Sequence, residues 1–245
     1  MRRYPSSVPP GIAFRPEFLD FRRGIHVGNL DDNQRITRIL KLALETRYGQ
    51  PFVTERYGRG VYWRWIGFLL KANREAKPRS NAYSFGCSKL FISVEPEEKL
   101  FKCGLQVERG YIKAPRGYGE WKLQEDWDWN RLVARLKPDS ELDRELRRLA
   151  GEGFAMFAGS WSGVSLPPKP GAYPGARKLK RLLETADPNE WAGFQLYYPM
   201  TEDEVRRSSG ADLVESMLAV FDEVSLVHDL TSDAGLRSQQ YSHAT

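Results

Sequence analysis

A strict alternation of side chains in residues 61–66 constrains the fold of this chain more than any other feature. If these residues are extended, Trp63 and Trp65 lie on one face and their even-numbered neighbours lie on the other. The Tyr-Gly-Arg-Gly sequence at residues 57–60 is typical of a turn. Together the alternation and the turn predict a β-hairpin whose second strand continues to Leu70.

A second hairpin is predicted soon after the first. Residues 89–94 are rich in β-forming side chains, the Glu-Pro-Glu-Glu sequence at residues 95–98 favours a turn, and the chain returns over residues 100–112. Helices mixed with short strands are predicted between residues 129 and 230 from the spacing of apolar side chains. We therefore expect an α+β fold: an antiparallel β-sheet built from two hairpins in the front half, packed with helices, and a mixed helix and strand C-terminal half.

Two helix N-termini are marked by residues that can cap them. Asp31 or Asp32 is expected to cap the first helix, which Gly49 ends. The Thr-Glu-Asp-Glu sequence at residues 201–204 is a capping box, in which the threonine oxygen accepts from an amide and the second glutamate reaches back. A helix is expected to begin there and to break near Gly210.

The domain organisation is simple. Residues 1–11 are polar and proline-rich, and we expect a mobile tail there; residues 235–245 are expected to be frayed. Between the tails we expect a single α+β domain over residues 12–232. The Gly/Pro-rich stretch at 159–175 is a possible sub-boundary within this domain.

Charge is distributed unevenly along the chain. Lys and Arg together number 37 against 32 Asp and Glu, which gives a net charge of +5. Residues 1–80 hold 16 basic and 7 acidic side chains, whereas residues 192–245 hold 3 and 9. A basic front and an acidic back indicate either a surface that faces a polyanion or two halves that attract each other.

Scarce cysteine and histidine exclude several classes of site. Two cysteines cannot build a disulfide scaffold or a four-cysteine metal centre, so we expect a cytoplasmic protein in which Cys87 and Cys103 are reduced and structural. His228 is interpreted as a histidine at a helix C-terminus. No apolar run is long enough for a membrane span, and no glycine-rich phosphate-binding motif is present, so we expect neither a membrane partner nor a nucleotide cofactor.

The hairpin at residues 89–112 supports one catalytic hypothesis. Metal-dependent nucleases place carboxylates on neighbouring strands so that they hold a metal ion, while a lysine assists the attacking water. Glu95 ends one strand, and Gln106 and Glu108 share a face of the other. A metal-dependent nuclease or other hydrolase that uses these three residues, with Mg²⁺ as its cofactor, is therefore an alternative. The simpler interpretation is a charged, solvated face of the sheet.

The basic and aromatic segment from Arg56 to Arg79 is the strongest functional signal. Single-stranded nucleic acid is held by cations along its phosphates and by rings beneath its bases. The candidate contact residues are Arg59, Tyr62, Trp63, Arg64, Lys71, Arg74, Lys77 and Arg79. The leading hypothesis is thus a protein that binds nucleic acid or another polyanion through this surface. A protein-interaction module with a basic front and an acidic back is a further alternative.

Overall fold

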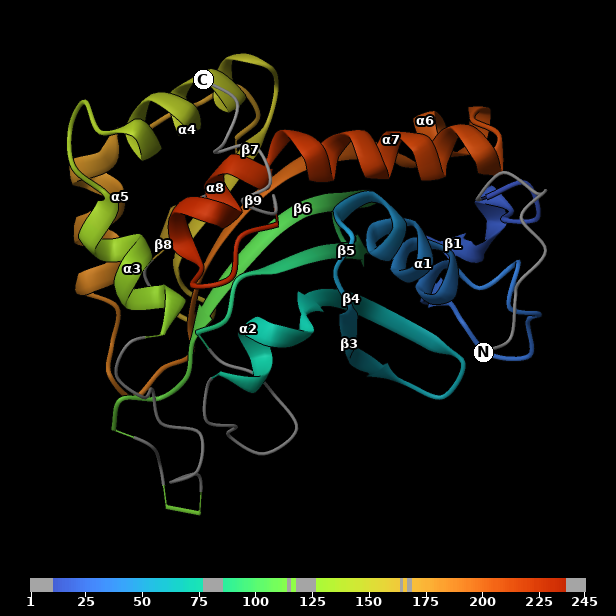
Figure 1. The fold of residues 1–245 in the computed structure, drawn as a ribbon, viewed down its shortest axis with the longest axis horizontal. Coiled ribbons are helices and arrows are strands. Elements are labelled where there is room, and N and C mark those ends of the chain that lie inside the picture. The colour runs from blue at the N-terminus through green and yellow to red at the C-terminus, as the bar shows by residue number, and fades with distance from the viewer. Residues whose placement is uncertain are drawn as a thin grey trace.

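The two predicted hairpins belong to one antiparallel sheet (Figure 1). The computed structural model describes residues 11–76, 86–113, 116–117, 127–163, 165–166 and 169–236. In chain order the strands are β1 (Leu19–Asp20), β2 (Gly24–His26), β3 (Phe52–Arg59), β4 (Tyr62–Leu70), β5 (Lys89–Glu95), β6 (Leu100–Arg109), β7 (Ala155–Ser160), β8 (Ser165–Leu166) and β9 (Ala192–Thr201). Every pairing between these strands is antiparallel.

The strand order explains how distant parts of the chain meet in this sheet. The order is β1-β2-β4-β5-β6-β9-β7-β8, and β3 pairs with β4 outside this path. Within the described part of the chain, β3 is therefore an edge strand. The end of β7 overlaps the start of the Gly/Pro-rich stretch at 159–175, and β7 pairs with β9, which follows that stretch in the chain.

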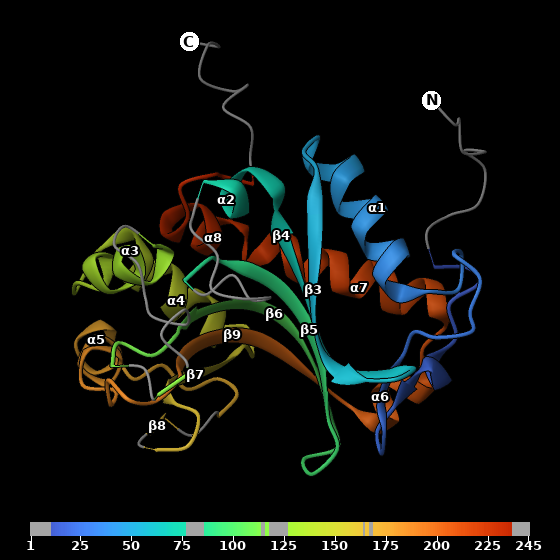
Figure 2. The same cartoon turned by 90° about the horizontal axis from the view of Figure 1, so that it is seen from below.

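Helices cover one face of the sheet, which confirms the expected α+β fold. They are the 3₁₀ turn η1 (Pro16–Phe18) and the α-helices α1 (Ile36–Tyr48), α2 (Lys71–Glu75), α3 (Asp128–Arg135), α4 (Glu141–Gly151), α5 (Ala176–Glu184), α6 (Glu202–Arg207), α7 (Gly210–Glu223) and α8 (Ser225–Thr231). Figure 2 shows α1, α7 and α8 on one side of the curved sheet. Alternate residues of β6, from Phe101 to Val107, are buried in the main core beneath these helices. The residues between them, among them Gln106 and Glu108, lie on the opposite face.

A β-bulge changes the expected orientation of the two tryptophans in β4. Tyr57 pairs with Trp65 and Gly58 pairs with Trp63, so Arg64 is an extra residue in this strand. Trp63 consequently packs against the main core, whereas Trp65 packs against a small cluster on the opposite face. The expectation that Trp63 and Trp65 share a face is therefore wrong, because strict alternation holds only in a strand without a bulge.

The helix boundaries show where local sequence rules hold. Gly49 ends α1 in the left-handed conformation, with a φ of 64°. The residue before α1 is Arg35, and no side chain caps this helix, so the capping role expected for Asp31 or Asp32 is wrong. The backbone oxygen of Asp31 instead accepts from Arg35, which places a separate turn ahead of the helix.

The predicted capping box is confirmed at the start of α6. The Thr201 hydroxyl oxygen accepts from the Glu204 amide, and the Glu204 carboxylate accepts from the Thr201 amide. The hydrogen bonds that the Thr201 hydroxyl and the Thr201 amide donate to the Glu204 carboxylate lower the pKa of Glu204. The helix ends at Arg207 and α7 begins at Gly210, which confirms the predicted break.

The two predicted tails fall largely outside the described residues, which begin at Gly11 and end at Leu236. Gly11 and Leu236 are both buried, and the Leu236 amide donates to Asp229 Oδ1 at 2.5 Å. Across the described ranges, none of the helices has both the length and the apolarity that crossing a bilayer requires.

Candidate functional site

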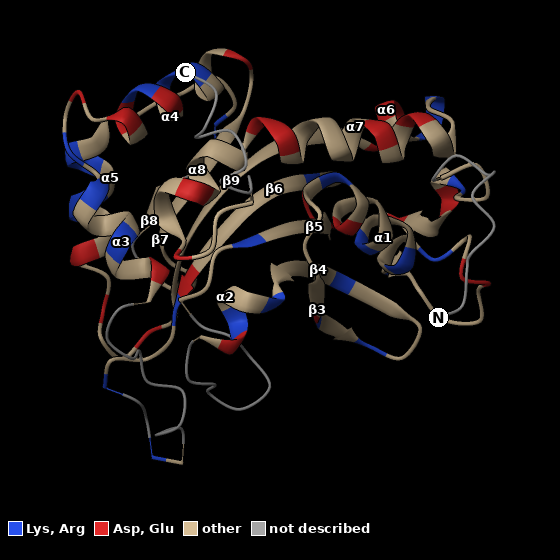
Figure 3. Cartoon of the chain, viewed as in Figure 1, with Lys and Arg blue, Asp and Glu red and all other residues tan. Residues whose placement is uncertain are grey.

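A groove with a volume of about 880 Å³ lies along the β3–β4 hairpin. The arginines in its lining are Arg23, Arg56, Arg59, Arg64 and Arg74. Glu55 is the one carboxylate among the described residues of this lining. The aromatic residues of the lining are Tyr57 and Tyr62. We call this feature the arginine groove. Figure 3 shows basic segments on β3, β4 and α2, whereas α6 and α7 carry acidic ones.

The geometry of the hairpin brings these side chains together. Arg59 is the cross-strand partner of Tyr62, so these two side chains share a face of the sheet. Gly58 allows the two strands to approach closely at the bulge, because a Cβ at this position would lie 2.5 Å from the Trp63 Cα. Its φ of 154° also lies where residues with a side chain are strained. The bulge adds Arg64 to the groove as the extra residue of β4.

The charges of the groove are only partly compensated. Arg23 Nε lies 2.6 Å from Asp20 Oδ2, and Arg74 Nε lies 3.6 Å from Glu55 Oε1. Arg64 is exposed, as is its partner Glu97, 3.6 Å away, and such pairs contribute little to stability. Arg56 and Arg59 are exposed, and neither forms an ion pair with a carboxylate of the described residues. The groove therefore retains an excess of positive charge.

The aromatic side chains near the groove differ in how much of their rings is free. His26 stacks on Tyr62 with ring centroids 4.9 Å apart, and the Arg23 guanidinium lies 4.3 Å from the centre of the same ring. The Trp63 ring is half-buried and is covered by Arg56 at 4.2 Å. By contrast, 62% of Tyr57 is exposed.

The structure brings together part of the predicted contact set. Arg59, Tyr62, Arg64 and Arg74 line the groove. Trp63 does not line it, because its ring packs against the core. Lys71 lies on α2 outside the groove lining, 3.7 Å from Glu75. Lys77 and Arg79 lie outside the described residues.

Among the cationic and aromatic residues of the groove, sequence reasoning missed three: Arg23, Arg56 and Tyr57. Arg56 and Tyr57 belong to the basic and aromatic segment on which the nucleic-acid hypothesis was based. Their exposure on an edge strand makes them available to a ligand. Arg23 comes from the loop between β1 and β2, far along the chain from the hairpin. No local pattern marks Arg23, because the pairing of β2 with β4 brings it to the groove.

A buried cluster of charges adjoins the groove at Glu55. Lys89 is 1% exposed, and its Nζ lies 2.5 Å from Glu108 Oε2 and 3.2 Å from Glu55 Oε2. Burial alone would lower the pKa of Lys89, but the charges of Glu108 and Glu55 outweigh it and raise the pKa. Lys89 is consequently a protonated, structural cation rather than a nucleophile. We call these three residues the Lys89 cluster.

The carboxylates of the nuclease hypothesis do not converge. Glu95 pairs with Leu100 at one end of the β5–β6 hairpin, and Glu108 lies at the other end, roughly 26 Å further along the strand. Gln106 lies near Glu108 but accepts from Trp65 Nε1 at 3.1 Å and from Gln195 Nε2 at 2.5 Å. The proposed set of Glu95, Gln106 and Glu108 cannot hold one metal ion, and the described residues contain no group of three or more His, Cys, Asp or Glu placed to do so.

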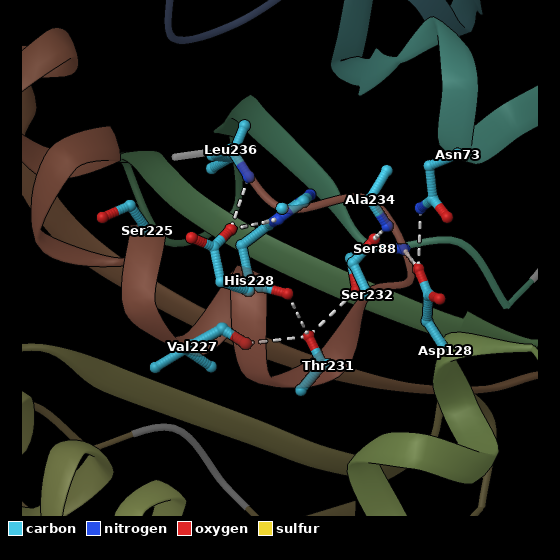
Figure 4. Close-up of polar contacts among 12 residues, drawn as sticks. Asn73, Ser88, Asp128, Ser225, Val227, His228, Thr231, Ser232, Ala234 and Leu236 are labelled. Carbon is cyan, nitrogen blue, oxygen red and sulfur yellow. Dashed lines mark hydrogen bonds and ion pairs between the residues drawn. The ribbon is translucent and has the colours of Figure 1, made fainter. Parts of the chain in front are cut away.

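A buried polar network fixes α2, and therefore Arg74, relative to the sheet (Figure 4). Asp128 Oδ2 accepts from Asn73 Nδ2 at 2.8 Å and from the Ser88 amide at 2.6 Å. The Ser88 hydroxyl lies 3.0 Å from the Thr231 hydroxyl of α8. Because Asn73 and Arg74 are neighbours in α2, this network positions one wall of the arginine groove.

The buried histidine His228 and the two cysteines occupy structural positions. His228 is buried in the last turn of α8, with Nδ1 3.3 Å from Asp229 Oδ1, which confirms its interpretation as a histidine near a helix C-terminus. Cys87 and Cys103 are both buried, and neither forms a disulfide. Burial raises the pKa of the Cys103 thiol, so this cysteine is a poor nucleophile.

The basic front and acidic back of the chain also meet within the molecule. Arg47 Nη1 and the Tyr48 hydroxyl of α1 contact Asp222 of α7 at 2.7 and 2.9 Å. Some of the charge asymmetry therefore stabilises the packing of α1 on α7.

Comparison with known proteins identifies no family. The sequence matches no family model, and no curated protein is detectably similar to it.

Proposed function

We propose that the arginine groove binds the phosphate backbone of a nucleic acid. The observation that carries this proposal is the groove lining, in which five arginines stand against the single buried carboxylate of Glu55. Guanidinium groups form paired hydrogen bonds with phosphate oxygens, and their charges release the counterions that surround a polyanion. Arg56 and Arg59 are the best candidates for phosphate contacts, because no carboxylate of the described residues forms an ion pair with them.

The groove suits an extended polyanion better than a small metabolite. It lies along a two-stranded ribbon at the edge of the sheet. Its cations come from three separate segments of the chain, so they can contact several phosphates in succession. We also propose a cytoplasmic location for this activity, where cysteines such as Cys87 and Cys103 are normally kept reduced.

A triple variant tests this function. Arg56, Arg59 and Arg64 are replaced by alanine together, and binding of a fluorescent 20-nucleotide oligomer is followed by anisotropy at several salt concentrations. Arg74 is left intact because it pairs with buried Glu55. We expect the triple variant to weaken binding on the order of 100-fold at 50 mM salt and to flatten the salt dependence by about two log units per decade.

A charge-matched variant provides the control. Arg177, Lys178 and Arg181 are exposed on α5, and replacing them with alanine removes the same net charge at a distance from the groove. This control should bind within about twofold of the parent, since only the overall charge changes. The proposal is wrong if the parent does not bind the oligomer at 50 mM salt, or if both triple variants weaken binding equally.

A further inference from the structure

Tyr57 is the one ring in the described groove lining whose faces are free of contacts with other rings and cations. The Tyr62 ring is already occupied by His26 and Arg23. No such contact involves Tyr57 among the described residues, and 62% of its surface is exposed. Burying a large aromatic ring normally stabilises a folded chain, so an exposed ring inside a cationic groove is suited to contact with a ligand.

We infer that the arginine groove takes nucleic acid as a single strand and that one base stacks on Tyr57. This inference rests on the proposed function and adds the class of ligand. A base in a single strand has a free face, and stacking on an aromatic side chain is favourable for every base. In a duplex the faces of the bases are covered by their neighbours, so only the phosphates remain for the arginines.

The surroundings of Tyr57 fit this arrangement. Arg59 lies two residues further along β3 on the same face, about 7 Å away along the strand. Gly58, between them, lies on the opposite face of the strand with Trp63 and therefore does not come between Tyr57 and Arg59. The cross-strand partner Trp65 is engaged elsewhere, because its Nε1 donates to Gln106. A base on Tyr57 therefore has an arginine beside it for an adjoining phosphate.

The stacking is tested with three probes of equal length: a single-stranded 20-mer, the same sequence as a duplex, and an abasic strand that has the phosphates but no bases. Tyr57→Ala should weaken binding of the single strand roughly 10-fold and leave the other two probes within about twofold of the parent. Tyr57→Phe retains the ring and should bind all three probes like the parent. A 2-aminopurine base in the single strand should be quenched on binding to the parent but not to Tyr57→Ala.

The outcomes separate this inference from the proposed function. If the Arg56, Arg59 and Arg64 triple variant weakens all three probes while Tyr57→Ala affects none, phosphate binding stands and base stacking is overturned. Equal weakening of the single strand and the abasic strand by Tyr57→Ala also overturns stacking, because the abasic strand has no base to lose. If none of the probes binds the parent, the proposed function itself fails. Tyr198→Ala, at another exposed tyrosine on β9, controls for nonspecific loss of an aromatic side chain.

Discussion

The arginine groove and the Lys89 cluster adjoin each other on one sheet, but positive charge is exposed in the groove and buried in the cluster. Lys89 is almost fully buried between the carboxylates of Glu108 and Glu55. Arg56 and Arg59 are exposed and have no carboxylate partner among the described residues. The surroundings of a cation, rather than its residue type, therefore distinguish a structural charge from one that is available to a ligand.

The two regions should also differ in how much the free energy of unfolding changes when a charge is removed. A buried charge is tolerated only when opposite charges and hydrogen bonds replace the water it has lost, so removing one member of a buried pair is costly. An exposed arginine keeps its hydration, so its removal hardly affects stability. The comparison thus predicts that stability depends on the Lys89 cluster and that binding depends on the groove.

The largest effect on stability is expected for Lys89→Met. This change leaves the carboxylate of Glu108 without its cation and Glu55 with Arg74 alone, and it should lower the free energy of unfolding by about 3–5 kcal/mol. Urea unfolding followed by circular dichroism measures the loss. Lys102→Met is the matched control on the same face, since Lys102 is also buried but its partners Glu95 and Glu98 reach solvent. Equal losses of stability for the two variants would contradict the expectation that Lys89 is more important for stability than Lys102.

A smaller effect is expected for Glu95→Gln at the other end of the β5–β6 hairpin. Burial raises the pKa of Glu95 above its ordinary value of 4.5, and the charge of Lys102 only partly opposes this. Because the fold favours the protonated carboxyl, this group contributes stability below about pH 4.5 and loses that contribution as the pH rises through its folded pKa.

Glu95→Gln should therefore be slightly more stable than the parent at pH 7 and equal to it at pH 4. Urea unfolding at both pH values checks this, with Glu97→Gln, a neighbouring exposed glutamate, as the control. A variant that is less stable at pH 7 would show that the ion pair with Lys102 outweighs burial.

The smallest effect on stability is expected for the triple groove variant. Replacing Arg56, Arg59 and Arg64 with alanine should change the free energy of unfolding by about 1 kcal/mol or less, because all three side chains are exposed and the contact of Arg56 with the Trp63 ring contributes little. The same preparation should show the large loss of binding described above. If the variant instead loses about 2 kcal/mol or more, these arginines are structural and the comparison with Lys89 fails.

Local patterns predicted much of this fold. The turn at residues 95–98 and the β-rich runs beside it predicted the β5–β6 hairpin. Gly49 and the capping box at Thr201 predicted the end of α1 and the start of α6, because these signals act within one helical turn. The bulge at Arg64 was not predicted, since it depends on how β3 pairs with β4 and not on the alternation within β4.

The candidate site was less predictable than the fold. The segment around Arg59 and Arg64 was found because its cations and rings are adjacent in sequence. Arg23 was missed because a strand pairing brings it to the groove from a distant loop. Lys89 and Glu108 lie on one hairpin, but Glu55 joins them from β3, so the buried cluster depends on the order of strands in the sheet.

The position of β3 at the edge of the sheet has a consequence for self-association. An edge strand offers unpaired backbone groups to which a second molecule can add a strand, and charged side chains are a common defence against this addition. Arg56 and Arg59 on β3 are charges of this kind, and they would repel their counterparts on a second copy of the chain. The same guanidinium groups that would attract a polyanion are thus placed to oppose the pairing of two molecules along this edge.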